Sequence, residues 1–160
     1  MVWFSFIRGL EITRYCNYTY LVLLKPESKF WKELKDNCSD IHWTRFENWA
    51  TPGVPDVFGI SNGINVFVEL KVITSNKIKL RPFQISWNYS HSLHGGRSFI
   101  MAKALPQRLL YIFTGSLVLS IADKGLRTEP KWVVDLQDPQ PWQQVQRILL
   151  HYPLPKPKAL

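Results

Sequence analysis

Cysteine is scarce in this chain, because only Cys16 and Cys38 occur among its 160 residues. Two cysteines at this separation match no spacing used by metal sites and cannot build the disulfide framework of a small secreted domain. We therefore expect ordinary thiols in a reducing compartment.

Long uninterrupted apolar runs are also missing. Segment 1–25 is rich in apolar and aromatic residues, but Arg8, Glu11 and Arg14 interrupt it. Signal peptides and membrane spans need longer apolar stretches, so neither is predicted and no membrane partner is expected. Segment 1–25 is either an additional strand pair packed on the domain or a poorly ordered extension, and the sequence leaves both open.

Internal repeats, low-complexity tracts and breaks in composition are absent as well. A chain of this length with 46% hydrophobic and 20% charged residues is expected to fold as one domain. We place that domain at residues 26–152. A Pro- and Lys-rich tail follows at 153–160 and is expected to be solvated.

Acidic residues are outnumbered, since 12 Asp and Glu stand against 20 Lys and Arg and give a net charge of +8. A basic surface favours a polyanionic partner, because contact with phosphates releases counterions. A basic protein without such a partner would show the same balance, so charge alone leaves both interpretations open.

The spacing of apolar residues predicts alternating helices and strands. Phe30, Trp31 and Leu34 have helical spacing, whereas residues 41–49 alternate as in a strand. The resulting order predicts an α/β fold with a mixed central β-sheet flanked by helices. The expected helices are 26–37, 81–96 and 141–152, and the expected strands are 41–49, two arms of a hairpin within 53–72, then 97–105, 108–115 and 116–123.

The hairpin carries charges where a buried strand normally carries Val or Ile. Asn62-Gly63 is the favoured pair for a two-residue type I′ turn. With that turn, counting back along both arms sets Asp56 opposite Glu69. Lys71 lies two residues beyond Glu69 and therefore on the same face. The turn alone thus predicts that the three charges converge.

Two opposed carboxylates repel each other and destabilise a sheet unless a cation lies between them. Mg²⁺ prefers oxygen ligands and accepts one or two protein carboxylates together with water and phosphate oxygens. A lysine beside such a pair can hold an attacking water or stabilise charge on a phosphate. The alternative is a structural cluster of Lys and carboxylates at a sheet end, which is costly when buried.

The same residues resemble a known family. Pro55-Asp56 followed by Glu69-Leu70-Lys71 resembles the signature of the PD-(D/E)XK nucleases, and the stretch HGGRSFIMAKA resembles the glycine-then-strand element that follows in them. The resemblance is closest to the virus-type replication-repair (VRR-type) nucleases and the Holliday-junction-resolvase-like endonucleases, and it covers about Glu27 to Ala104. It implies a restriction-endonuclease-like core with the order α-β-β-β-α-β.

The resemblance also implies roles for the site residues. Asp56 and Glu69 would be metal ligands, with the backbone carbonyl of Leu70 completing the protein's contribution. Lys71 would position or activate the water. Gln84 would bond to that water or to the phosphate.

The first helix of the family supplies a further catalytic, metal-binding glutamate, for which Glu27 and Glu33 are the candidates. Glu27 is preferred because of its interval to Leu34. Glu33 is the alternative, although it could equally be an exposed helix charge.

Basic residues near the motif are candidates for contacts to the nucleic-acid backbone. Each of them could instead belong to a solvated face. The candidates are Arg45, Lys77, Lys79, Arg81 and Arg97.

Two other groups of residues lie outside the family pattern. His91 and His94 are interpreted as residues at a helix end, with DNA contact as the alternative. Trp43, Trp49 and Trp87 are expected mainly in the core, although aromatic rings can also stack on bases.

Together these features predict a Mg²⁺-dependent DNA endonuclease, with Mn²⁺ able to substitute, acting on branched or Holliday-junction DNA. A nuclease acting on linear duplex or single strands, and a non-catalytic nucleic-acid-binding module, are the alternatives. The resemblance further implies a homodimer, a phage or bacterial origin and a cytoplasmic location, which for a phage protein is the host cytoplasm.

Overall fold

The computed structural model describes residues 25–46 and 52–153. The strands in these ranges form a six-stranded sheet in the order β1-β2-β3-β4-β5-β6. Neighbouring strands are antiparallel, except that β3 and β4 are parallel. The elements are α2 (Pro26–Asn37), β1 (His42–Arg45), β2 (Val57–Ser61), β3 (Ile64–Ile73), α3 (Pro82–Leu93), β4 (Ser98–Ala104), β5 (Leu109–Thr114), the 3₁₀ turn η1 (Gly115–Leu117), α4 (Val118–Lys124), the 3₁₀ turn η2 (Gly125–Arg127), β6 (Trp132–Asp135) and α5 (Pro141–His151).

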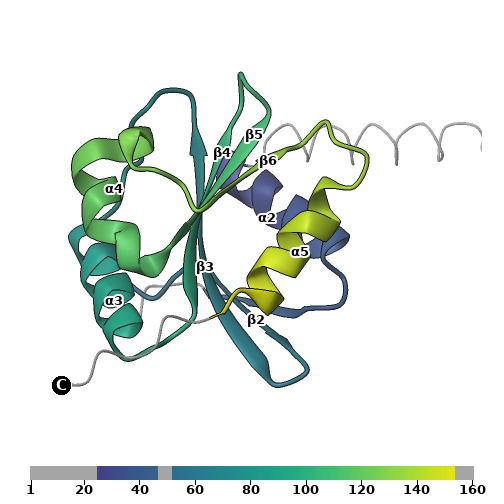
Figure 1. The fold of residues 1–160 in the computed structure, drawn as a ribbon, viewed down its shortest axis with the longest axis horizontal. Helices are drawn as coiled ribbons and strands as arrows, with labels where there is room; N and C mark the ends of the chain where they lie inside the picture. Colours follow the sequence, from purple (N-terminus) through teal and green to yellow (C-terminus); the bar gives the residue numbers. More distant parts are fainter. Residues whose placement is uncertain (1–24, 47–51, 154–160) are drawn as a thin grey trace, which may run out of the picture.

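The sheet separates two helical layers (Figure 1). Helices α2 and α5 cover one face, and α3 and α4 cover the other. This arrangement confirms the predicted α/β fold with a mixed central sheet. The chain order α2-β1-β2-β3-α3-β4 is the expected α-β-β-β-α-β core.

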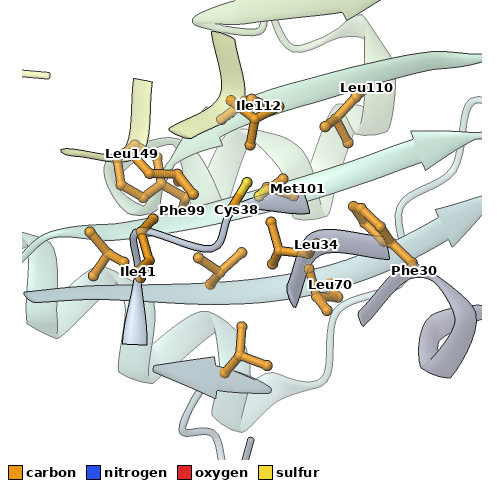
Figure 2. Packing of buried hydrophobic residues seen from close by; sticks show 14 of the residues in the cluster. Phe30, Leu34, Cys38, Ile41, Leu70, Phe99, Met101, Leu110, Ile112 and Leu149 are labelled. Carbon is orange, nitrogen blue, oxygen red and sulfur yellow. The ribbon is translucent and has the colours of Figure 1, made fainter. Parts of the chain in front are cut away.

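Strand β3 runs through the middle of the molecule and serves both layers. Val66, Val68 and Leu70 are buried in the core beneath α2 and α5, part of which Figure 2 shows. The residues between them face α3, where the ring of Phe67 lies 5.0 Å from that of Trp87. Because side chains alternate along a strand, Glu69 and Lys71 also face α3.

The turn between β2 and β3 has the predicted backbone geometry. Asn62 and Gly63 both have positive φ, 47° and 77°, as a type I′ turn requires. The strand register pairs Ser61 with Ile64 and Val57 with Val68. The predicted hairpin register is therefore confirmed.

The predicted strand at 116–123 is wrong, because this segment forms η1 and α4. Val118 and Ile121 are buried and Leu119 is 53% exposed. Burial three residues apart is helical periodicity, whereas a strand would bury alternate residues. The richness in apolar residues concealed this spacing.

Strand β6 was not predicted, because its four residues offer too short a pattern to recognise. Most predicted boundaries were also too wide. The strand expected at 41–49 covers only His42–Arg45 in the described residues, and the helix expected at 81–96 is Pro82–Leu93. Gly95 follows that helix with a φ of 75°, consistent with a glycine stop.

The expectations for segments 1–25 and 153–160 fall outside the described residues apart from Lys25 and Pro153, as does the one for Trp49. Among the helices in the described ranges, none combines the length and the hydropathy needed to cross a bilayer.

Candidate active site

Asp56 stands directly before β2, where the ladder between β2 and β3 ends. Its Oδ2 accepts a hydrogen bond of 2.9 Å from the backbone N–H of Leu70. A side-chain oxygen of Asp56 thus accepts this N–H in β3, where a backbone carbonyl would accept it in a longer ladder. Continuing the observed register by one residue sets Asp56 opposite Glu69. The charge of Asp56 accordingly acts on Glu69. The hairpin thus brings the two predicted carboxylates together.

Glu69 is fully buried, with 0% of its surface exposed. Its Oε1 forms an ion pair of 2.8 Å with Lys71 Nζ and accepts a hydrogen bond from Gln84 Nε2. Its Oε2 is buried and has no hydrogen-bond partner among the described residues. Burial, and secondly the charge of Asp56, raise the pKa of Glu69 from 4.5 to about 7 against the opposing effects of Lys71 and Arg81.

An uncompensated buried oxygen is costly unless something else occupies its lone pairs. Among the described residues, Oε2 of Glu69 is therefore the buried carboxylate oxygen of this cluster that is free to bind a cation.

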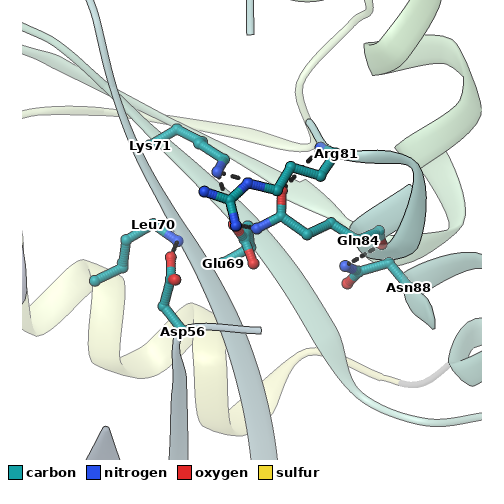
Figure 3. Close-up of polar contacts among 7 residues, drawn as sticks. All are labelled: Asp56, Glu69, Leu70, Lys71, Arg81, Gln84 and Asn88. Atoms are coloured by element: carbon teal, nitrogen blue, oxygen red, sulfur yellow. Dashed lines mark hydrogen bonds and ion pairs between the residues drawn. The ribbon is translucent and has the colours of Figure 1, made fainter. Parts of the chain in front are cut away.

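Gln84 connects this cluster to the start of helix α3 (Figure 3). Its Oε1 accepts the backbone N–H of Arg81 at 2.9 Å and lies 3.5 Å from Lys71 Nζ. Because the N–H of Arg81 can only donate, this contact fixes which end of the amide faces Glu69. The Asn88 side chain donates in turn to the carbonyl of Gln84 at 2.9 Å.

Both ends of the Gln84 amide are thus engaged by the protein. Gln84 therefore orients Glu69 and Lys71. It also lines the cavity, so the predicted bond to water or phosphate stays a prediction.

A cavity of about 570 Å³ opens over these residues. It gathers parts of the molecule that are far apart in the sequence: the start of α2, the end of β1, the loop before β2, strand β3 and the start of α3. Four cationic side chains stand on its wall, a surface suited to phosphate. The lining residues are Lys25, Glu27, Arg45, Pro52, Gly53, Val54, Asp56, Leu70, Lys71, Arg81, Phe83 and Gln84.

The structure separates the two candidate glutamates of α2. Glu27, in the first turn, lines the same cavity as Asp56 and Lys71. Glu33 instead forms an ion pair with Lys103 and lines a different cavity at the end of β4. The separation of six positions, about 1.7 helical turns, thus places one carboxylate at the site and directs the other to a separate partner.

The basic residues predicted to contact nucleic acid divide into three groups. Arg45 and Arg81 line the cavity, and Arg45 Nη2 also reaches Ser28 Oγ at 3.4 Å. Lys77 and Lys79 are exposed on the segment before α3, outside the cavity lining.

Arg97 lies away from the cavity. Its Nη1 donates to the carbonyls of Leu149 and Leu150 at 3.1 and 3.2 Å. These are the last-turn carbonyls of α5, which a helix leaves unpaired. Its burial lowers the pKa of its guanidinium. The structure therefore gives Arg97 a packing contact where the sequence suggested a phosphate contact.

Packing contacts account for His91, Trp87 and Trp43. The ring of His91 stacks on Trp87 at 4.4 Å, and burial lowers its pKa. His94 is exposed at the end of α3. Trp43 packs edge-on against Trp31 at 6.2 Å. Within the described ranges there is no cluster of three or more His, Cys, Asp or Glu able to hold a metal.

The oxygen atoms at the hairpin nevertheless suit a hard divalent cation. Asp56 and Glu69 offer two carboxylates, and in the part of the chain that the structure describes no group bonds to Oε2 of Glu69. The carbonyl of Leu70 lies on the same side of β3 as its N–H, which faces Asp56. Mg²⁺ commonly takes one or two carboxylates and leaves its other positions to water and phosphate. These residues therefore fit Mg²⁺, with Glu27 on the nearby wall.

Five lining residues were not predicted as site residues from the sequence: Lys25, Pro52, Gly53, Val54 and Phe83. Lys25 precedes the first helix without any distinguishing signal. Phe83 has helical spacing with Trp87, which is typical of a buried helix face, but it is 65% exposed. The buried face of α3 instead follows Gln84 and Asn88, four residues apart. Helical spacing from the predicted site residue Gln84 would have revealed this.

A pH dependence of stability follows from the buried Glu69. The pKa of Glu69 is about 7 in the folded protein and 4.5 when unfolded, so the folded state holds the proton more tightly. The stabilisation is fully present below the unfolded pKa and is lost as the pH rises through 7. At pH 8 the loss amounts to roughly 3 kcal/mol.

The free energy of unfolding, measured with urea in the presence of a chelator, should therefore fall more between pH 5 and pH 8 in the wild type than in Glu69→Gln. Equal decreases in the two proteins would contradict this assignment.

No protein-family model and no curated protein sequence matches the chain. Among solved structures, it is similar to Hjc, a Holliday junction resolvase from the archaeal hyperthermophile Archaeoglobus fulgidus. The match has a TM-score of 0.47 and 12% sequence identity, and it covers 58% of this chain and 75% of the resolvase chain. A similarity of this degree carries no information on activity.

Proposed function

We propose that this protein is a Mg²⁺-dependent DNA endonuclease. The observation that carries the proposal is the fully buried Glu69, whose Oε2 has no hydrogen-bond partner among the described residues. Glu69 lies beside a second carboxylate, Asp56, which lines a cavity with cationic walls. A purely structural ion pair would satisfy both oxygens of a carboxylate buried to this degree. The arrangement also repeats the order of residues in the PD-(D/E)XK signature.

Each residue has a definite task in this proposal. Asp56 and Glu69, with the carbonyl of Leu70, hold the metal. When bound, Mg²⁺ supplies positive charge that polarises the phosphodiester and makes water a better nucleophile at neutral pH. Lys71 lies 2.8 Å from Glu69 and also lines the cavity, so its ammonium can hold water or stabilise charge on the phosphate. Gln84 keeps Lys71 and Glu69 in position.

The cationic wall is the proposed site for the DNA backbone. Arg45, Arg81 and Lys25 are distributed over three separate elements around the cavity. Contacts of this kind position a phosphate without reading its sequence. Lys77 and Lys79, exposed on the segment that leads into α3, would extend this surface.

Branched DNA is the substrate proposed from the motif resemblance, with cleavage leaving a 5′-phosphate and a 3′-hydroxyl. A four-way junction exceeds the reach of a domain this small, so a symmetric dimer is part of the proposal. Mn²⁺ is expected to replace Mg²⁺, and the cytoplasm is the proposed location.

A substrate panel tests the function. Junction, flap, linear duplex and single-stranded DNA of matched sequence are incubated with the protein in Mg²⁺, in Mn²⁺ and in chelator. We expect cleavage with either metal, fastest on branched DNA, and none in chelator. Binding without cleavage of any substrate would instead support a non-catalytic module, and equal cleavage in chelator would exclude the metal-dependent mechanism.

The contrast between the two glutamates of α2 gives a prediction of its own. Glu27→Gln should lower Mg²⁺-dependent cleavage by about 10-fold or more and raise the Mg²⁺ concentration required, as changes around a metal site commonly do. Glu33→Gln is the matched control, because Glu33 pairs with Lys103 away from the cavity. The measurement is the rate of cleavage by each variant as a function of Mg²⁺ concentration. A larger effect of Glu33→Gln would reverse the assignment.

A further inference from the structure

The ring of Phe83 is exposed to solvent at the rim of the candidate active site. It is 65% exposed and lines the same cavity as Asp56 and Lys71. Several large apolar side chains are exposed in the described residues, but Phe83 is the one among them that also lines this cavity. An exposed phenylalanine elsewhere would need no explanation, but one at a polar, cationic cavity does.

The exposure of Phe83 does not come from a loose backbone. Phe83 lies in the first turn of α3, between Pro82 and the anchored Gln84. The loop before Asp56 also closes onto it: a Cβ atom at Gly53 would lie only 2.4 Å from the carbonyl oxygen of Phe83. Gly53 has a φ of +93°, which other residues rarely adopt. The backbone on both sides therefore holds the ring at the rim.

The surroundings of Phe83 match those of surfaces that bind unpaired nucleotides. Such surfaces combine cations that follow the phosphate backbone with aromatic rings on which bases stack. Here Arg81 lies two residues before Phe83, and Lys25 and Arg45 line the same cavity. A protein-docking patch would instead need a continuous apolar area, whereas the neighbours of Phe83 in the cavity are mostly polar or charged.

We propose that Phe83 determines substrate specificity by stacking on an unpaired base next to the phosphate held at Asp56 and Lys71. Bases inside a continuous duplex are covered on both faces by their neighbours, so the ring can reach only a base that has left the stack. The site therefore prefers DNA with unpaired nucleotides at the point of cleavage. This inference rests on the proposed nuclease function and names the feature of the DNA that it selects.

The test compares Phe83→Ala, Phe83→Leu and Phe83→Trp with Tyr89→Ala. Tyr89 is the matched control, because it is an exposed aromatic residue of the same helix that does not line the cavity. Two DNA substrates of identical sequence are used, one fully paired and one unpaired around the cleavage site. Affinity is measured in chelator, together with the fluorescence of 2-aminopurine at the unpaired position. Cleavage is measured separately in Mg²⁺.

Phe83→Ala should weaken binding of the unpaired substrate by on the order of 10-fold, the usual effect of losing one stacked base, and leave the duplex unchanged. Phe83→Leu keeps an apolar side chain without a ring and should lose as much. Phe83→Trp should retain affinity and the quenching of 2-aminopurine, and Tyr89→Ala should match the wild type.

Equal losses on both substrates, or none, would overturn the inference. Preserved stacking by Phe83 without cleavage of any DNA would overturn only the nuclease function. The two failures are therefore distinguishable.

Discussion

Glu69→Gln should lower Mg²⁺-dependent DNA cleavage by about 10³-fold, which corresponds to about 4 kcal/mol of lost transition-state stabilisation. The substitution preserves the shape of the side chain. The amide oxygen can still accept from Lys71 and Gln84 at the position of Oε1. The amide nitrogen then occupies the position of Oε2, which has no hydrogen-bond partner within residues 25–46 and 52–153. A nitrogen that carries two hydrogens cannot bind a cation.

Measurements of folding stability distinguish a loss of catalysis in Glu69→Gln from a loss of folding. Glu69→Gln removes a buried charge, so in chelator at pH 8 the variant should be at least as stable as the wild type. Adding Mg²⁺ should then raise the melting temperature of the wild type and not that of the variant, because a ligand stabilises only the protein that binds it. A variant that loses both activity and folding would indicate a structural role for Glu69.

Lys71→Met should reduce the rate of cleavage by about 10²- to 10³-fold, as the loss of one charged donor at a reacting centre commonly does. Methionine keeps most of the apolar stem, so the packing beside α3 is retained. Glu69 must lose its proton to bind a metal ion, so activity should rise as the pH passes its pKa. The Lys71 charge lowers the pKa of Glu69, and removing that charge should therefore shift this rise of activity to higher pH.

Single-turnover rates measured across a pH series test both effects of Lys71→Met. Lys71→Arg is the control that keeps the positive charge. If Lys71→Met cleaved at the wild-type rate, Lys71 would be limited to a structural ion pair with Glu69.

The sequence predicted the convergence of Asp56, Glu69 and Lys71, because a local rule determined it. A two-residue Asn-Gly turn allows one register, and that register carries Asp56 and Glu69 to the same end of the hairpin. This register could be predicted without knowing how the hairpin packs in the folded protein. The α/β order followed for a similar reason, since the long elements have strong periodicity.

The predictions that failed depended on tertiary contacts. Segment 116–123 has apolar residues compatible with either a strand or a helix, and packing against the sheet selected the helix. The last-turn carbonyls of α5 engage Arg97 across more than fifty positions of sequence, and nothing near Arg97 indicates this contact. The preference for Glu27 over Glu33 rested on the family resemblance, and the docking of α2 on the sheet gives it a physical basis by placing Glu27 at the cavity and Glu33 beside Lys103.

The most direct test of the central claim is single-turnover cleavage of one branched DNA by the wild type and by Glu69→Gln, side by side in Mg²⁺. The folded state of both proteins is verified in the same buffer. The account predicts cleavage by the wild type and at least a 10³-fold slower reaction by the variant, on the scale expected for a metal ligand. Equal cleavage by the two proteins, or no cleavage by the wild type with either Mg²⁺ or Mn²⁺, would contradict it.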